Sequence, residues 1–310
     1  MTLISFCIVN TNGRDDLLAC VESILRHPPA TEFEVLVIDN ASEDGSAQAL
    51  RAAHGSRIEV IELPRRRSKP ENDSELLGRA RGRYCLLLNE DSELTTGAAD
   101  ALRRALDQEP RAAAAGARLI DSTGAARPSA WRFPGPRSAL AAAVGLHRRF
   151  TVQSRGSRQR SVDWVQSAGM LVRKQAFEEV GPLDPTFFVY SDEVDWQKRA
   201  HDAGWCVLYV PDARIVHHEQ LSTGDSASRR IVEFSRNRDA YVRKHNGPAA
   251  ALLVRILTAW TYAVRALAAL VLPGHDARRY ARHAYHSLLP RRGQGLREAA
   301  EEFNRRRDST

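Results

Sequence analysis

The apolar positions of the first 120 residues alternate between strand-like and helix-like patterns. Leu3–Val9 is a short apolar run, Asp15–Arg26 carries apolar residues at helical spacing, and Phe33–Ile38 is a second β-rich run. The alternation continues with helices at Gly45–Ala53, up to Ala80 and at Gly97–Leu106, and with strands at Ile58–Leu63, Tyr84–Leu88 and Ala112–Ile120. This order predicts an α/β fold with a Rossmann-like, mostly parallel central sheet and flanking helices.

The pattern changes after residue 120. Asp121–Arg160 is rich in glycine, proline, serine and arginine, which predicts mostly loop with one short helix near Leu140–Leu146. Later elements are predicted at Val162–Val172, Lys174–Val180, Asp192–Ala203, Trp205–Val210 and Arg229–Leu272. We therefore expect one globular domain over 1–228, with halves at about 1–120 and 121–228, a C-terminal helical region over 229–290, and a charged, flexible tail over 291–310.

The segment Ala249–Leu272 is very apolar but contains Arg255 and Arg265. Only nine uncharged residues separate these arginines, fewer than the roughly 18–20 that span a bilayer. Two interpretations remain. The segment is an amphipathic helix at a membrane surface, with its arginines toward anionic headgroups, or it is part of a helical hairpin that packs on the protein core.

Charge and cysteine content restrict the class of protein. The net charge is +7, and arginine supplies nearly all of the positive charge, because the chain has only four lysines. Arginine suits phosphates, anionic membranes or nucleic acid, although a GC-rich genome would also enrich it. The four cysteines lack CxxC spacing, which predicts buried free thiols in a reducing compartment. We interpret MTLISFCIVN as a first strand, not a signal peptide, and expect the protein in the cytoplasm.

Three of the predicted strands end in polar residues: Asn10-Thr11-Asn12, Asp39-Asn40 and Asn89-Glu90-Asp91. The carboxyl ends of parallel strands meet at one edge of a sheet, where ligands bind in such folds. Asn89 and Asp91 lie on the same side of an extended chain, and Mg²⁺ binds through one or two carboxylates together with phosphate oxygens. The alternative is a solvated acidic turn or a helix cap.

Two further motifs carry candidate chemistry. Asp192 and Glu193 stand at a predicted helix start, where a carboxylate either serves as a general base or, after the N-cap Ser191, stabilises the helix dipole. His217 and His218 follow a strand-like stretch, and adjacent side chains on an extended chain point in opposite directions. At most one of these histidines should therefore face a given site.

Taken together and in this order, the motifs resemble those of the family 2 glycosyltransferases, inverting enzymes of the GT-A fold, and within them the rhamnosyltransferase-like branch. The resemblance runs from about Ile4 to Gly247. It is carried by the stretches IVNTNGRDDLLACVESIL, VIDNASEDGS, ARGRYCLLLNEDSEL, VDWVQSAGMLVRKQAFEEVGPLDPTFFVYSDEVDWQKRAHDAGW and YVPDARIVHHEQLSTG.

The resemblance implies roles for individual residues. Asn10, Thr11, Asp39 and Asn89 would line the nucleotide-sugar pocket, with Asp39 accepting a hydrogen bond from the base. Asp91 would hold Mg²⁺ or Mn²⁺ against the donor diphosphate, with His217 beside it. Asn89 replaces the first aspartate of the family's DxD-like motif. Glu193 falls at the position of the catalytic base, and Asp192 is the alternative because the usual Glu-Asp order is reversed here.

These roles imply transfer of a sugar, rhamnose by resemblance, from a dTDP- or UDP-sugar donor to a hydroxyl of a glycan or lipid-linked acceptor in cell-envelope polysaccharide synthesis. We expect a cytoplasmic enzyme with peripheral contact to the inner face of the membrane and no nucleic-acid partner. The basic loop Arg65–Lys69 replaces an Asn-x-Gly segment of the branch and is interpreted as solvated, with donor-phosphate contact as the alternative.

Two rival functions remain open. A nucleotidyltransferase would also hold a metal and a diphosphate on such a sheet, but Asn12-Gly13-Arg14 is too short for a glycine-rich triphosphate loop. A degenerate, non-catalytic sugar-binding scaffold is the stronger rival, because Asn89 and the reversed acidic pair depart from the active pattern.

Overall fold

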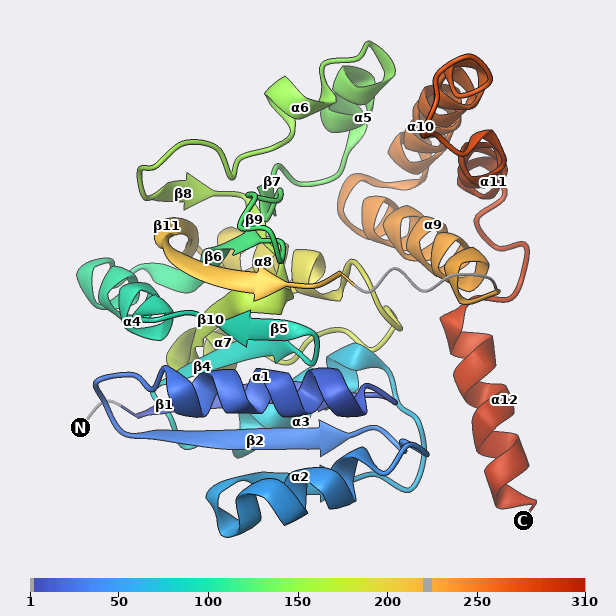
Figure 1. Ribbon diagram of the computed structural model, residues 1–310. Helices are drawn as coiled ribbons and strands as arrows, with labels where there is room; N and C mark the ends of the chain where they lie inside the picture. The colour runs from blue at the N-terminus through green and yellow to red at the C-terminus, as the bar shows by residue number, and fades with distance from the viewer. Residues whose placement is uncertain (1–2, 220–224, 310) are drawn as a thin grey trace. The chain divides into compact units, whose positions relative to one another are not determined.

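The computed structural model describes residues 3–219 and 225–309 (Figure 1). The chain divides into two compact units. The sheet unit comprises 3–131, 153–185 and 193–219, and the helical unit comprises 132–152, 186–192 and 225–309. This division differs from the predicted one, since two short segments from before residue 228 belong with the C-terminal helices. One reason is aromatic packing within the helical unit, where the rings of Tyr190 and Phe234 meet edge to face at 5.7 Å.

Within residues 3–219, nine strands form one mixed sheet in the order β3-β2-β1-β4-β10-β6-β11-β5, with β8 paired to β11. The strands are β1 Ile4–Asn10, β2 Phe33–Asp39, β3 Glu59–Glu62, β4 Tyr84–Asn89, β5 Ser92–Leu94, β6 Ala112–Ile120, β8 Arg160–Val162, β10 Met170–Arg173 and β11 Cys206–His217. The predicted parallel strands β1 to β4 are confirmed. Beyond β4 the sheet becomes mixed, because β10 runs antiparallel to both β4 and β6. The short strands β7 Ala130–Trp131 and β9 Trp164–Val165 form a separate pair.

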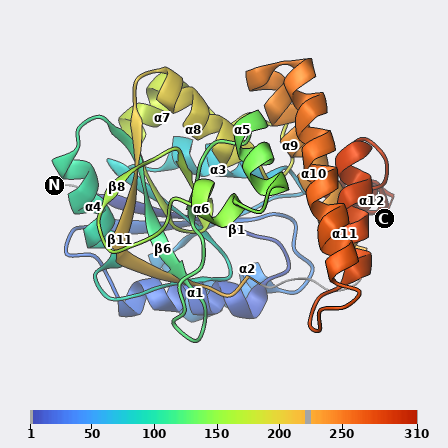
Figure 2. The same cartoon turned by 90° about the horizontal axis from the view of Figure 1, so that it is seen from above.

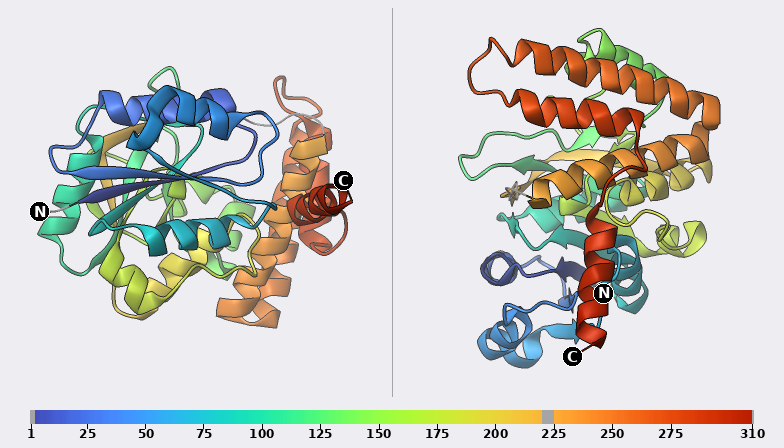
Figure 3. Two further views of the ribbon diagram at one scale, coloured as in Figure 1. Left: turned by 90° about the horizontal axis from the view of Figure 1, so that it is seen from below. Right: turned by 90° about the vertical axis from the view of Figure 1, so that its right-hand side faces the viewer.

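Helices cover both faces of the sheet (Figure 3, left). They are α1 Arg14–Arg26, α2 Ser46–His54, α3 Lys69–Arg79, α4 Ala98–Gln108, α7 Lys174–Val180 and α8 Asp192–Asp202, with 3₁₀ turns at Gly55–Arg57 and Ser167–Gly169. Two hydrophobic cores lie on the two faces of the sheet, and successive residues of β1 belong alternately to one and the other. Phe6 and Ile8 pack with α1 and α4, whereas Cys7 packs with α3 and α8. All four cysteines are free thiols, as predicted, and three of them are buried.

The helical unit consists of α5 Pro136–Ala143, α6 His147–Phe150, α9 Asp225–Asn246, α10 Pro248–Ala268, α11 Ala277–Leu288 and α12 Leu296–Asp308 (Figures 2 and 3). The predicted helix over Arg229–Leu272 is two helices, because Gly247 adopts a φ of 85° and Pro248 starts the next helix. Helix α10 packs on α9, α11 and α5.

The tail predicted to be flexible contains helix α12. Glu298 accepts a hydrogen bond from the Gly295 backbone N–H at 2.6 Å and pairs with Arg236 at 2.8 Å. Phe303, on the same helix, is buried. Within the segment predicted to be charged and flexible, Leu296–Asp308 is thus a capped helix with buried Ala300 and Phe303.

Acidification should destabilise the helical unit. Burial, reinforced by nearby Arg279 and Arg238, lowers the pKa of His283 to about 4, and burial also lowers the pKa of His147 and His286. Because the unfolded histidines take up protons near pH 6.5 and the folded ones at lower pH, stability is full above pH 6.5 and falls as the pH drops toward 4.

We expect the midpoint of urea unfolding to decrease between pH 7 and 5, with His283 contributing about 1 kcal/mol after allowance for solvent screening. His283 stacks on Tyr262 with ring centroids 4.5 Å apart, so His283→Phe keeps a ring at this position. The variant should show a smaller pH dependence than the wild type. An unchanged slope would contradict the assignment.

Candidate active site

The turn between β4 and β5 meets the end of β11 at the edge of the sheet. Asn89 is the last residue of β4, and β5 starts at Ser92. Strand β5 runs antiparallel to β11, with Ser92 opposite His217 (Figure 1). The His218 backbone N–H also donates to the Asp91 carbonyl at 3.0 Å. These backbone contacts bring together side chains that lie more than 120 residues apart in the sequence.

His217 lies against both polar residues of this turn. Its Nε2 atom is 3.2 Å from the Asp91 Oδ1 atom and 3.2 Å from the Asn89 Nδ2 atom. The His217 side chain is only 6% exposed and that of Asp91 15%. His218 points the other way, and its Nε2 atom lies 2.7 Å from Glu93 Oε1. Only one of the two histidines therefore faces Asp91, as strand alternation requires.

Asn10 and Asp39 form a second polar group at the ends of β1 and β2. The Asn10 Nδ2 atom lies 3.0 Å from Asp39 Oδ2 and 2.9 Å from the Ser46 hydroxyl, and the Ser42 backbone N–H donates to Asp39 Oδ1 at 2.8 Å. Asn10 and Asp39 are both buried. The network ties the loop after β1 to the loop after β2 and fixes the orientation of the Asp39 carboxylate.

Thr11 is held from the neighbouring strand by Asn40, a residue to which the sequence assigned no role of its own. The Asn40 Nδ2 group donates to Thr11 Oγ1 at 3.3 Å and to the Arg67 carbonyl at 3.1 Å, while Asn40 Oδ1 accepts from the Arg67 backbone N–H at 2.8 Å. The Arg67 guanidinium pairs with Glu75 at 2.6 Å, and Lys69 pairs with Asp73. At least two cations of the basic loop are thus committed to helix α3.

The two polar groups are adjacent. Strands β1 and β4 are paired in parallel, with Val9 opposite Asn89. A Cβ atom placed on Gly13 would lie 3.0 Å from the Glu90 Cγ atom and 3.1 Å from Asn10 Oδ1. The loop after β1 therefore lies against both polar groups. It approaches them this closely because Gly13 has no side chain.

Helix α8 carries the predicted base. Glu193 is 9% exposed, and Asp192, which the division of the chain assigns to the helical unit, is fully buried. Two consecutive non-glycine residues, Tyr190 and Ser191, precede them with φ values of 68° and 65°. Such backbone costs about 1–3 kcal/mol per residue and tends to occur at functional sites.

Three residues that the sequence did not single out fix α8 in the sheet unit. Buried Gln197 donates to the carbonyls of Val165 and Glu193, 2.8 Å and 2.9 Å away, and accepts from the Val165 N–H at 2.8 Å. Trp196 donates to the Gly181 carbonyl at 3.0 Å, and Arg199 pairs with Asp195 at 2.9 Å. The signal was in the sequence, since polar residues on the inner face of a predicted helix need buried partners.

The donor set around Asp91 fits a divalent cation that a substrate helps to hold. One carboxylate and one imidazole converge with 3.2 Å between their nearest atoms. Among residues 3–219 and 225–309, no group of three or more histidine, cysteine, aspartate or glutamate side chains is arranged to hold a metal. One carboxylate is nevertheless enough for cations such as Mg²⁺, which bind through one or two carboxylates and take their remaining oxygens from phosphates and water.

Comparison with known proteins identifies the family. The family model for glycosyl transferase family 2 matches residues 5–181, more than half of the chain. The chain is 31% identical over 248 residues to the N-acetylglucosaminyl-diphospho-decaprenol L-rhamnosyltransferase of Mycobacterium tuberculosis, a match that covers 70% of this chain and 78% of that protein.

Solved glycosyltransferase structures share the fold. The mannosyltransferase PcManGT from Pyrobaculum calidifontis, in complex with GDP-Man and Mn²⁺, superposes with a TM-score of 0.58 at 15% identity and covers 98% of this chain and 84% of its own. GalNAc-T7 with UDP, GalNAc and Mn²⁺ gives a TM-score of 0.57 at 16% identity, over 97% of this chain but only 56% of its own. The sheet unit thus has the GT-A architecture, and the chain belongs to glycosyltransferase family 2.

Proposed function

We propose that the protein transfers a sugar, with inversion, from a nucleotide-diphosphate donor to a hydroxyl of a glycan or lipid-linked acceptor in cell-envelope polysaccharide synthesis. The observation that carries this proposal is the convergence of Asn89, Asp91 and His217 beside the Asn10–Asp39 network. The similarity to the mycobacterial enzyme favours rhamnose and a diphospho-lipid acceptor, and the donor that we propose is a dTDP- or UDP-linked sugar.

The nucleotide would bind across the ends of β1, β2 and β4. Asp39 would accept a hydrogen bond from the base, with Asn10 and Ser42 holding its carboxylate in place. Thr11 and Asn89 would line the same crevice toward the diphosphate. Because the carboxylate and amides are already oriented by internal hydrogen bonds, binding would require little reorganisation of this edge.

Asp91 and His217 would hold Mg²⁺ or Mn²⁺, which, when bound, neutralises the charge that develops on the leaving diphosphate. His217 is positioned for this from β11 and Asp91 from the β4–β5 turn, so both ligands come from backbone that the sheet fixes. The Mn²⁺ ions in the PcManGT and GalNAc-T7 complexes support a divalent cation in this fold.

Glu193 would take the proton from the acceptor hydroxyl as that oxygen attacks the anomeric carbon and the nucleoside diphosphate leaves from the opposite face. Asp192 is the alternative base. Glu193 is preferred, because its side chain keeps some exposed surface while Asp192 is entirely enclosed. Gln197 fixes the backbone carbonyl of Glu193 and so contributes to positioning the carboxylate.

We further propose that the enzyme works in the cytoplasm, peripherally attached to the inner face of the membrane, where a lipid-linked acceptor would be presented. Helix α10 is 21 residues long and, by length and composition, could cross a bilayer, but one side of it packs on α5, α9 and α11 within the helical unit. The proposal is therefore attachment to the surface.

The metal ligands can be tested by nucleotide binding. Thermal unfolding with dTDP, UDP or GDP should show Mn²⁺-dependent stabilisation by one of them, of about 2.7 kcal/mol at 100 times the dissociation constant. Asp91→Asn and His217→Ala should each abolish the part that depends on Mn²⁺. The matched control is the neighbouring pair of Glu93 and His218. Glu93→Gln and His218→Ala should each retain the Mn²⁺-dependent stabilisation.

Failure of every nucleotide to stabilise the wild type would instead favour the non-catalytic scaffold. Equal loss in the Glu93 and His218 variants would also contradict the assignment, because that pair points away from Asp91.

The base can be tested by transfer assays under saturating donor. Glu193→Gln should lower kcat by about 10²–10⁴-fold, the usual contribution of a general base, while metal-dependent nucleotide binding persists. Asp192→Asn distinguishes the two carboxylates, and exposed Asp202→Asn at the other end of α8 is the control. A larger loss in Asp192→Asn, with the fold intact, would reassign the base to Asp192.

A further inference from the structure

Helix α10 of the helical unit carries large apolar side chains that are exposed, in addition to its buried side. Its outward large apolar side chains are 44–68% exposed. They are Leu252, Leu253, Ile256, Trp260, Val264 and Leu267. At about 100° per residue these positions fall within an arc of about 120°. On other sides of the helix, Ala251, Val254 and Ala259 are buried.

Neighbouring segments of the helical unit extend this surface. Helix α5 packs on α10 and exposes Leu140, and the residues after it expose Val144 and Leu146. The turn after α10 exposes Leu270, Val271 and Leu272 by 52–81%. We call the exposed apolar side chains of α5, α10 and these adjoining turns the α10 face. Soluble monomers rarely expose contiguous apolar patches above a few hundred Å², so a patch of this kind marks an interaction surface.

The charges around the α10 face identify its partner. Segments 132–152 and 247–292 contain eleven arginines and one acidic residue, Asp276, a formal charge of +10. The whole chain carries +7, so everything outside these two segments is net negative at −3. A second copy would present the same positive charge and be repelled, whereas an anionic bilayer offers both an apolar interior and negative headgroups.

The arginines of α10 itself have partners within the helical unit, whereas one of the two interpretations of the sequence directed them toward anionic headgroups. Arg255 donates two hydrogen bonds to the Asp239 carboxylate, at 2.6 and 2.7 Å, and the Arg265 guanidinium lies over the Tyr262 ring at 5.6 Å. The apolar stripe is therefore uninterrupted by charge. Exposed cations include Arg265 on another side of α10, Arg149 of α6, and Arg278 and Arg279 of α11.

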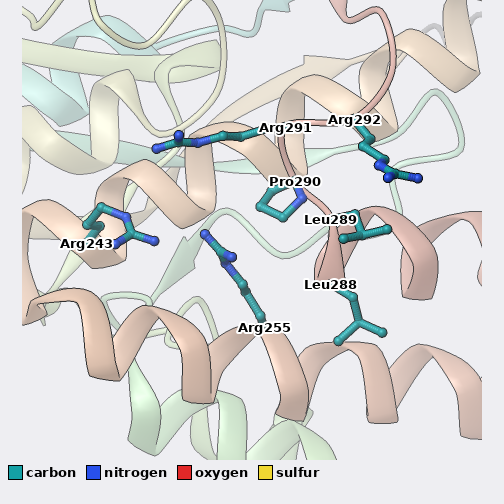
Figure 4. A pocket seen from close by; sticks show the side chains of 7 residues that line it. All are labelled: Arg243, Arg255, Leu288, Leu289, Pro290, Arg291 and Arg292. Atoms are coloured by element: carbon teal, nitrogen blue, oxygen red, sulfur yellow. The ribbon is translucent and has the colours of Figure 1, made fainter.

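Four arginines gather where α9 and α11 end near the start of α10. They line a cavity of about 460 Å³ together with two leucines and a proline (Figure 4); the lining residues are Arg243, Arg255, Leu288, Leu289, Pro290, Arg291 and Arg292. Asp239 balances one of the charges through Arg255. A net positive cavity with partly exposed leucines fits a phosphate group attached to an apolar tail, because guanidinium forks bind phosphate oxygens in pairs.

We propose that the α10 face binds the surface of an anionic phospholipid bilayer, with α10 lying in the interface and the arginine cavity receiving a headgroup phosphate. The proposal makes the membrane attachment specific and is independent of the catalytic assignments. Binding can therefore fail while sugar transfer to a soluble acceptor analogue persists, and transfer can fail while binding persists.

Vesicle co-sedimentation of the full chain tests the proposal. We expect binding to vesicles of phosphatidylcholine with about 30% phosphatidylglycerol, and much weaker binding to pure phosphatidylcholine. The stripe variant Leu253→Gln/Ile256→Gln/Trp260→Gln should lose binding. Arg149→Gln/Arg279→Gln should weaken it about 25-fold, on a basis of about fivefold per arginine. The control Arg57→Gln/Arg104→Gln removes the same charge from exposed positions of the sheet unit and should bind like the wild type.

Two more measurements distinguish insertion of the α10 face from attraction by charge alone and from self-association. Vesicles should shift the tryptophan emission to the blue, and Trp260→Phe should remove that shift while Trp164→Phe keeps it. Arg291→Gln/Arg292→Gln should weaken binding to anionic vesicles, but the blue shift of Trp260 should be unchanged once excess vesicles bind all of the protein. Equal binding by the stripe variant and the wild type would overturn the proposal, as would a dimer, seen by analytical ultracentrifugation, that dissociates only in the stripe variant.

Discussion

The pairing of β5 with β11 is the constraint on which the candidate active site depends. Three residues of β5 hold the last part of β11 in antiparallel register, and this register selects His217 rather than His218 to face Asp91. A slip of one residue would exchange the two histidines, since neighbouring side chains on a strand point to opposite faces. The geometry of the candidate site thus depends on backbone hydrogen bonds as well as on its side chains.

Further hydrogen bonds fix the other polar residues of the candidate site. The Asn10–Asp39–Ser46 network aligns the polar groups at the ends of β1 and β2, and Gln197 joins α8 to β9 so that the backbone of Glu193 is fixed. Strained φ values at Tyr190 and Ser191 occur directly before the acidic pair. Hydrogen bonds that are already satisfied within the protein cost nothing when a ligand arrives, which is how rigid sites gain affinity and rate.

The helical unit differs from the sheet unit in where its polar and apolar side chains lie. Its helices bury polar groups in pairs, as Arg255 and Asp239 do, yet leave the outer stripe of α10 and the turn after it apolar. The unit concentrates positive charge while the rest of the chain is net negative. The sheet unit thus carries the candidate active site, and the helical unit carries the exposed apolar stripe and most of the excess positive charge.

The sequence by itself determined the local elements and the identity of the chemical groups. Strand and helix periodicity located β1 to β4 and their helices, because each side of these elements meets a different environment, and motif order indicated the family. Only the tertiary structure showed which histidine contacts Asp91 and that Asn40 and Gln197 support the candidate site. Only the tertiary structure showed that the sheet becomes mixed after β4 and that segments 132–152 and 186–192 belong with the C-terminal helices. It also showed that Arg255 turns inward and that the tail contains a helix. Each of these depends on partners distant in the chain, and local patterns of polarity carry no information about which distant group will satisfy a buried donor or cover an apolar face.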